Sequence, residues 1–112
     1  MPQARISVRL RFHDQARLGP GKIALLEAVQ STGSVAAAGA SQDMSARRAW
    51  LLIDSLNKAF DQPVVVTDPG SESEPASEPV EARLTALGEQ IIRAYRAVEA
   101  DTRDTVSGRF AE

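Results

Sequence analysis

Apolar and polar residues alternate strictly over residues 5–12. A period of two places successive side chains on opposite faces of an extended backbone, so this segment predicts a half-buried strand. The arginines on its polar side suit a solvated face that protects a sheet edge, and contact with phosphate is the alternative. The apolar side consists of Ile6, Val8, Leu10 and Phe12.

A first helix is predicted over residues 20–32. Pro20 suits a first helical turn, where its missing N–H costs nothing, and apolar residues then recur at helical spacing. Gly33 follows as a favourable residue for ending a helix. The spacing gives this helix one face in the core.

Residues 34–60 predict two helices joined by a turn. Ser34 and Ser45 are good N-cap residues, and a polar break separates the two helices. Small residues fill the first helix, whereas the second has a clean apolar stripe, with Trp50 packing beside it. The stripe consists of Ala49, Leu52, Ile53, Leu56 and Phe60.

This layout is that of a helix-turn-helix, whose second helix enters the DNA major groove by its N-terminal end. Residues 45–60 are the expected recognition helix. Its first turn carries Arg47 and Arg48 in tandem, where the helix dipole disfavours cations. A functional reason for both arginines is therefore favoured.

The remaining residues predict two short strands and a long helix. Residues 64–84 contain β-branched residues, then a low-complexity acidic stretch that cannot bury surface, and then a return strand. Such a pair after a helix-turn-helix is a winged-helix arrangement. Residues 85–106 predict a helix whose apolar stripe is too long for one small core, so we expect it to pair with a second copy.

Composition limits the chain to one modest domain, expected over residues 1–112. Hydrophobic residues make up 43% and charged residues 25% of the 112 residues, which is ordinary for a globular protein. No apolar run approaches the roughly 20 residues of a membrane span, and the N-terminus is not a signal peptide. Without cysteine there is no disulfide or thiolate metal site. A cytoplasmic protein is expected.

The charges are distributed unevenly along the chain. Residues 1–60 hold eight Lys or Arg against four acids, whereas residues 61–112 hold five Arg against eleven acids. The basic surface that nucleic acid requires is therefore expected in the first half.

The sequence gives little indication of catalytic, nucleotide-binding or metal-binding residues. The single histidine, His13, is more typical of a surface residue than of a catalyst. The carboxylates cluster without a partner that would shift their pKa. Residues 19–22, GPGK, have the composition of a phosphate loop but lack its spacing and its Ser or Thr. No enzyme activity, cofactor or metal is expected.

Several motifs together resemble the N-terminal DNA-binding domain of the ModE family of molybdate-responsive repressors, which is related to the LysR-type winged helix. The resemblance covers roughly residues 5–98. Its most specific pieces are Thr32-Gly33-Ser34, Met44-Ser45-x-Arg47-Arg48-Ala49-Trp50, Ile53-Asp54, Leu56-Asn57 and Leu84-Thr85-x-x-Gly88.

The resemblance implies a mainly α fold with a small β-wing (α+β), an N-terminal strand and a long C-terminal dimerisation helix. It also implies a homodimeric, sequence-specific transcription regulator that binds a palindromic operator in double-stranded DNA. Ser34 would hold a phosphate at its helix N-terminus. The residues expected at bases and phosphates are Ser45, Ala46, Arg47, Arg48 and Lys58.

The chain departs from the family pattern just before Met44. The family usually has Ala-Ala-Arg-x-Leu-Gly there, whereas residues 38–43 read AGASQD. Gly39 costs the short helix about 1 kcal/mol relative to Ala, and Asp43 replaces the turn glycine. Ala46 replaces a usual Tyr. These departures predict a compromised supporting helix.

The expected wing and the expected ligand also differ from the family. The wing is acidic, which weakens attraction to phosphate, so a degenerate protein-interaction module that has lost DNA binding is the alternative. Full-length ModE proteins carry C-terminal molybdate-binding domains, for which this chain is too short, so molybdate binding is not expected. The acidic wing residues are Asp68, Glu72, Glu74, Glu78 and Glu81.

Overall fold

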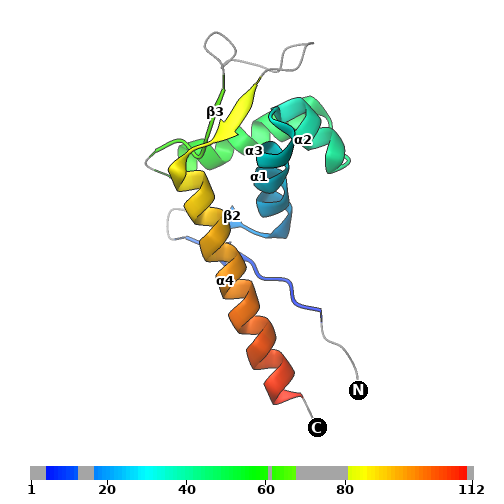
Figure 1. The fold of residues 1–112 in the computed structure, drawn as a ribbon, viewed down its shortest axis with the longest axis vertical. Coiled ribbons are helices and arrows are strands. Elements are labelled where there is room, and N and C mark those ends of the chain that lie inside the picture. The colour runs from blue at the N-terminus through cyan, green and yellow to red at the C-terminus, as the bar shows by residue number, and fades with distance from the viewer. Residues whose placement is uncertain (1–4, 13–16, 61, 68–80, 111–112) are drawn as a thin grey trace.

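The chain forms four helices and two small antiparallel strand pairs in the described residues (Figure 1). The structure is a computed structural model that describes residues 5–12, 17–60, 62–67 and 81–110. In chain order the elements are β1 Leu10–Arg11, β2 Arg17–Leu18, α1 Pro20–Thr32, α2 Val35–Ser41, α3 Ala46–Ala59, β3 Val65–Thr67, β4 Ala82–Leu84 and α4 Ala86–Arg109.

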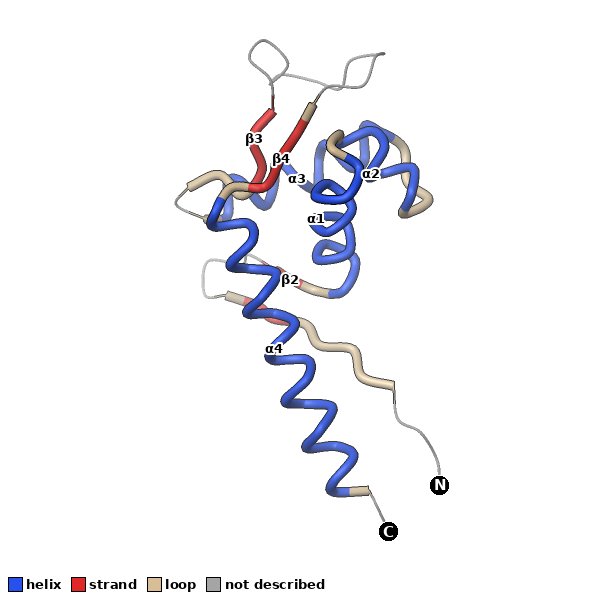
Figure 2. The backbone as a smooth tube through the Cα atoms, viewed as in Figure 1, coloured by secondary structure: helices blue, strands red, loops and turns tan. Residues whose placement is uncertain are grey.

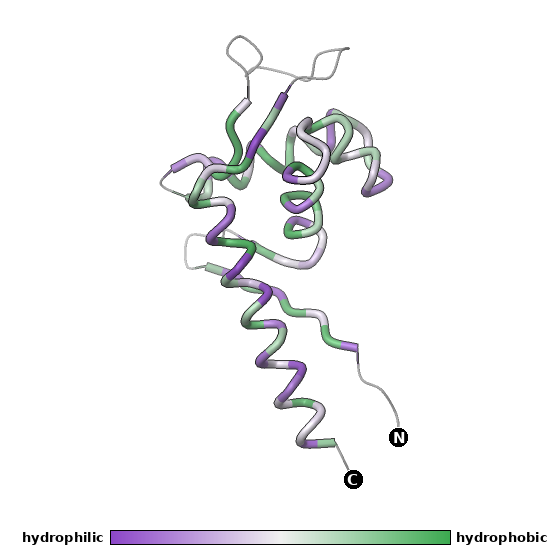
Figure 3. The backbone as a smooth tube through the Cα atoms, in the orientation of Figure 1, coloured by the Kyte–Doolittle hydropathy of each residue, from purple (hydrophilic) through white to green (hydrophobic). Residues whose placement is uncertain are grey.

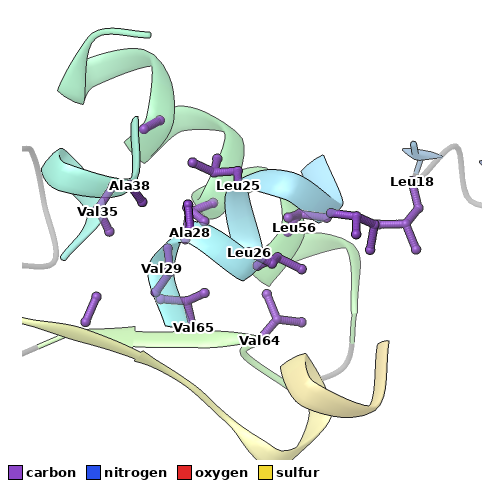
Figure 4. Close-up of a cluster of buried hydrophobic side chains, with 14 of the residues drawn as sticks. Leu18, Leu25, Leu26, Ala28, Val29, Val35, Ala38, Leu56, Val64 and Val65 are labelled. Carbon is purple, nitrogen blue, oxygen red and sulfur yellow. The ribbon is translucent and has the colours of Figure 1, made fainter. Parts of the chain in front are cut away.

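Helix α1 lies at the centre of the molecule. It contacts α2, α3, α4 and β4, and in Figure 2 it lies between α2 on the right and the β3–β4 pair on the left. Its Ile23, Leu25, Leu26 and Val29 side chains are fully buried, and Figure 4 shows three of them among residues of α2, α3 and β3. The buried residues include Leu25 and Ala28 and are not confined to the single face that the spacing predicted, because a helix with neighbours on several sides buries more of its circumference.

The N-terminal strand is much shorter than the expected residues 5–12. Only Leu10 and Arg11 form β1, which pairs with Leu18 and Arg17 of β2. Side chains before β1 still alternate between half-buried and exposed, and the Tyr95 hydroxyl donates a hydrogen bond to the Val8 carbonyl. The alternation therefore identified the inward face, but a strand also needs a partner strand, and residues 5–9 lie against α4 instead.

The β3–β4 hairpin is fixed to the end of α3 by one side chain. The Asn57 amide nitrogen donates to the Val65 carbonyl at 3.0 Å, and its oxygen accepts from the Val64 amide at 2.8 Å. Val65 then pairs with Leu84 and Thr67 with Ala82. The acidic stretch expected in the wing lies outside the described residues, apart from Glu81.

Helix α4 begins in contact with the hairpin and then leaves the core. The Thr85 hydroxyl accepts from the Gly88 amide at 3.1 Å and donates to the Pro63 carbonyl at 2.8 Å. The helix reaches Arg109 and so is longer than the expected 85–106. In Figure 3 its far part is mostly hydrophilic with interspersed apolar positions (Figure 3). Val98 in this part of the helix and Phe110 at its C-cap are exposed.

One charged cluster joins α4 to α1. The Arg96 guanidinium bonds the carboxylates of Glu27 and Glu99, each at 2.6 Å. These two bonds raise the pKa of Arg96 and satisfy the buried Glu99. Within the described residues, no helix combines the length and apolar character that crossing a bilayer requires.

Candidate nucleic-acid interface

Helices α2 and α3 begin with matching caps. The Ser34 hydroxyl oxygen accepts from the Ala37 amide at 3.0 Å, and the Ser45 hydroxyl oxygen accepts from the Arg48 amide at 3.1 Å. Each bond satisfies one of the amides that a helix N-terminus leaves unpaired. The sequence therefore marks the start of both helices correctly.

The turn between the two helices holds them in close contact. The Met44 amide donates to the Gly39 carbonyl at 2.9 Å. Asp43 adopts a left-handed φ of 59°, the conformation in which the family's glycine is expected. A Cβ on Gly39 would lie 2.7 Å from the Ala49 Cβ, closer than two carbon atoms pack.

Gly39 is therefore a requirement of the packing and not a defect of α2. The expectation of a compromised supporting helix is wrong at this position, because the absence of a side chain lets α3 cross α2 at short range. Gln42, in place of an apolar anchor, is exposed at the C-cap, while Met44 packs partly against the core.

The outer face of α3 points away from the core. The buried positions Ala49, Ile53 and Leu56 mark the inner side of the helix. At 3.6 residues per turn, Arg47 and Leu51 lie roughly opposite them. Leu51 is 48% exposed.

Lys58 lies at the far end of the same outer face. It is about 17 Å along the helix axis from Arg47, given a rise of 1.5 Å per residue. Its ammonium pairs with the Asp54 carboxylate at 2.8 Å. Lys58 thus belongs to the face but sits far from the N-terminal turn and already has a partner.

The tandem arginines point in different directions. Consecutive helical residues are separated by about 100° around the axis, so Arg48 lies on the flank of the outer face that holds Arg47. Arg48 lines a cleft, together with the start of α1, whereas Arg47 does not. Ser45 and Ala46 directly precede Arg47 at the start of α3. Ser45 is exposed and Ala46 is half-buried.

Ser34 is less accessible than expected. It is 7% exposed, and its backbone forms a bridge to Glu81 beside the hairpin. Its hydroxyl oxygen is already occupied by the Ala37 amide. This burial leaves Ser34 a capping role and argues against the phosphate contact expected of its side chain.

A cleft of about 650 Å³ lies between the first strands, the start of α1 and the flank of α3. Five basic side chains line it, and no acidic residue is among the described residues that do so. The Lys22 ammonium donates to the Arg17 carbonyl at 3.1 Å, which orients Lys22 along the rim. The basic residues are Arg9, Arg11, Arg17, Lys22 and Arg48.

Two features of the site escaped sequence reasoning. Leu51 could have been found by noting which leucine falls outside the apolar stripe. The cleft required tertiary contacts, because β1, β2 and α3 are brought together only in the fold. Across the described residues, no group of three or more His, Asp or Glu is placed to hold a metal ion. His13 lies outside those residues.

Comparison with known proteins relates the chain to molybdenum proteins. It is 36% identical over 92 residues to molybdenum-pterin-binding protein MopB of Rhodobacter capsulatus, covering 82% of this chain and 32% of that protein. MopA of the same organism is 32% identical over 83 residues, covering 74% and 29%. Molybdenum transport protein ModE of Azotobacter vinelandii is 32% identical over 98 residues, covering 85% and 34%. No family model matches the chain.

These similarities support a relationship to ModE-type proteins, of which the chain spans about a third of the length. The expectation that molybdate binding does not apply is corrected by this finding. Two relatives are named as molybdenum-pterin-binding proteins and the third as a molybdenum transport protein, so a molybdenum ligand is part of what these relatives are named for. All three names describe binding or transport rather than an enzyme.

Proposed function

We propose that this chain is the DNA-binding part of a molybdenum-responsive transcription regulator. In this proposal the chain is a winged helix-turn-helix, α3 enters the major groove, and the β3–β4 hairpin is the wing. The relatives named for molybdenum binding and transport supply the link to molybdenum. Binding of molybdate by the complete protein is part of the proposal.

One observation carries the proposal: α3 presents an exposed face at its capped N-terminus while its opposite face is locked into the core. Ala49, Ile53 and Leu56 anchor the helix, so its outer side chains are presented by a rigid element. A site built on such an element can read a groove without further ordering.

The chemistry of the outer face suits base reading. Arg47 has no carboxylate partner among the described residues, and arginine bonds guanine O6 and N7 in a bidentate manner. Such a contact discriminates against other bases by about 1–3 kcal/mol. Leu51 supplies an apolar surface of the kind that contacts a thymine methyl group.

A homodimer would bring two copies of α3 to successive turns of DNA. The exposed Val98 on α4 and Phe110 at its C-cap supply apolar surface beyond the core for a second copy. Two-fold symmetry would then place the recognition helices about 34 Å apart, one turn of the duplex.

A protein-interaction module is the second candidate, and the charges favour it. Asp54 neutralises Lys58 on the outer face, and Glu81 is exposed beside the start of α2. Both carboxylates weaken attraction to a phosphate backbone.

Fluorescence anisotropy with DNA selected from a random library tests the proposal. We expect a salt-dependent affinity that Arg47→Ala lowers by about tenfold, the loss of a contact worth about 1.4 kcal/mol. Arg93→Ala, which removes an exposed arginine from α4 before the part that holds Val98, is the matched control and should leave affinity nearly unchanged. No binding by the wild-type chain even at low salt would favour the interaction module.

A further inference from the structure

We propose that the basic cleft beside α3 binds a tetrahedral oxyanion. The same chemistry has two sources, a phosphate of the DNA backbone or a free ion in solution. The DNA source rests on the proposed function, whereas the free-ion source does not. The cleft would add to the site on the outer face of α3, because Arg48 lines the cleft and Arg47 does not.

The charges in the cleft are concentrated, and no acidic side chain among the described residues lines it. The five basic residues come from β1 and its approach, β2, α1 and α3, and so are brought together only by the fold. In the part of the chain that the structure describes, ion pairs form at Lys58 and Arg96 but at none of these five. Like charges around one cavity repel each other, and a bound anion removes that cost.

The start of α1 adds favourable dipoles to the cleft wall. Gly19, Pro20, Gly21 and Lys22 all line it. The N-cap residue Gly19 has no side chain that could cap the helix, and the first turn holds no acidic residue. Unpaired amides and a positive helix end at this point favour an anion. Residues 19–22 lack the spacing of a phosphate loop, but in the fold they lie beside arginines from the first strands and α3.

The remaining walls of the cleft are apolar, and its volume leaves space beyond the anion. Leu10, Leu18, Met44 and Leu52 line the cleft between the basic residues and lower the local polarity, which strengthens charge interactions. A volume of about 650 Å³ exceeds that of one oxyanion. The extra apolar space suits the sugars on either side of a backbone phosphate, while the basic residues suit either source.

Gly21→Glu tests the cleft with little risk to folding. A Cβ on Gly21 would meet nothing within 4 Å, and an acidic residue in a first helical turn is favourable. The new carboxylate would occupy the cleft and neutralise its charge. Gln90→Glu, which adds the same charge to an exposed position near the start of α4, is the matched control. Arg17→Gln is a second variant, which removes one cleft cation.

The first measurement is thermal unfolding with phosphate, sulfate or molybdate at constant ionic strength. If the free ion is a source, the wild-type melting temperature rises by roughly 5 °C at ten times Kd. The rise is lost in Gly21→Glu, reduced in Arg17→Gln and kept in Gln90→Glu. This measurement needs no DNA, so it does not depend on the proposed function.

The second measurement is the salt dependence of DNA affinity. If the backbone is a source, Gly21→Glu lowers the slope of log K against log salt by about one to two, and Gln90→Glu does not. Either result supports the cleft and identifies its source. Wild-type binding to DNA with no change in either measurement overturns the cleft but leaves the proposed function standing. Ion binding without DNA binding would support the cleft and overturn the proposed function. If the chain binds neither ion nor DNA, the cleft and the proposed function are both overturned.

Discussion

Helices α2 and α3 begin with the same serine cap and are held in place by opposite means. Helix α3 buries large side chains such as Ile53 and Leu56. Helix α2 is seven residues long and contributes Val35, Ala38 and Gly39 to the interior. Burial of apolar area holds α3, whereas close approach of the backbone holds α2.

A short helix of small residues is not weak by default. An isolated seven-residue helix is marginal in water, so α2 depends on its neighbours. Small side chains let α3 come near enough to supply those contacts. The two helices should therefore respond to opposite kinds of substitution, α3 to lost volume and α2 to added volume.

Truncation of the α3 anchor should have the largest effect. Leu56 is 1% exposed, so Leu56→Ala should lower the free energy of unfolding by about 2–5 kcal/mol. Urea denaturation measures the change. Leu51→Ala makes the same substitution at a 48% exposed site and should change stability by about 0.5 kcal/mol or less. Equal losses at the two sites would contradict the division into inner and outer faces.

Added volume in α2 should have the next largest effect. Gly39→Ala forces a Cβ against Ala49, so unfolding free energy should fall by about 1–3 kcal/mol despite the better helix propensity of alanine. Gly108→Ala is the control, because a Cβ there meets nothing within 4 Å. It should stabilise α4 by up to about 1 kcal/mol. Chemical denaturation of the pair should give changes of opposite sign.

Removing either cap tests what the two helices share. Ser45→Ala and Ser34→Ala each leave one amide without its partner and should cost about 0.5–2 kcal/mol. Ser34 should cost more, since it is buried and water cannot replace the lost bond. Thermal melts of both variants, with Ser107→Ala on exposed α4 as the control, measure the difference. A neutral Ser34→Ala would show that the cap is not what fixes α2.

The turn residue between the helices should have the smallest effect. Asp43→Gly relieves a left-handed conformation, a gain of about 1 kcal/mol that is offset by the entropy of glycine in the unfolded chain. The net change should be a stabilisation of a few tenths of a kcal/mol. Asp43→Asn removes the same charge with similar tolerance of the conformation and should be neutral in the same denaturation experiment. A clear loss with glycine would mean that the Asp43 side chain itself supports the turn.

Elements with local signals were the ones that the sequence predicted well. The expected helix over residues 20–32 coincides with α1, because Pro20 and Gly33 fix both ends through their own backbone preferences. Trp50 packs against the core as expected. Periodicity also identified the inner face of α3, since helical geometry depends only on spacing.

Features that depend on a distant partner were predicted poorly. Residues 5–9 alternate like a strand but have no strand beside them. Helix propensity predicts that Gly39 destabilises α2. The local sequence does not show that Ala49 packs against it and leaves no room for a side chain. The tandem arginines were treated as one unit, although a helix separates neighbours by about 100°. The cleft that receives Arg48 is assembled from segments far apart in the chain.

The connection between the hairpin and α4 couples the long helix to the α2–α3 helix pair. Thr85 binds both Pro63 and the first turn of α4, and the Ala82 amide binds the Gly33 carbonyl at the start of α2. A helix of 24 residues is about 36 Å long. Its course along the core is fixed by the Tyr95 hydroxyl on the Val8 carbonyl and by Arg96 on Glu27 of α1, and the part beyond Glu99 extends away from these contacts. A force applied at the free end of α4 therefore acts on α1 through Arg96 and on the start of α2 through the hairpin.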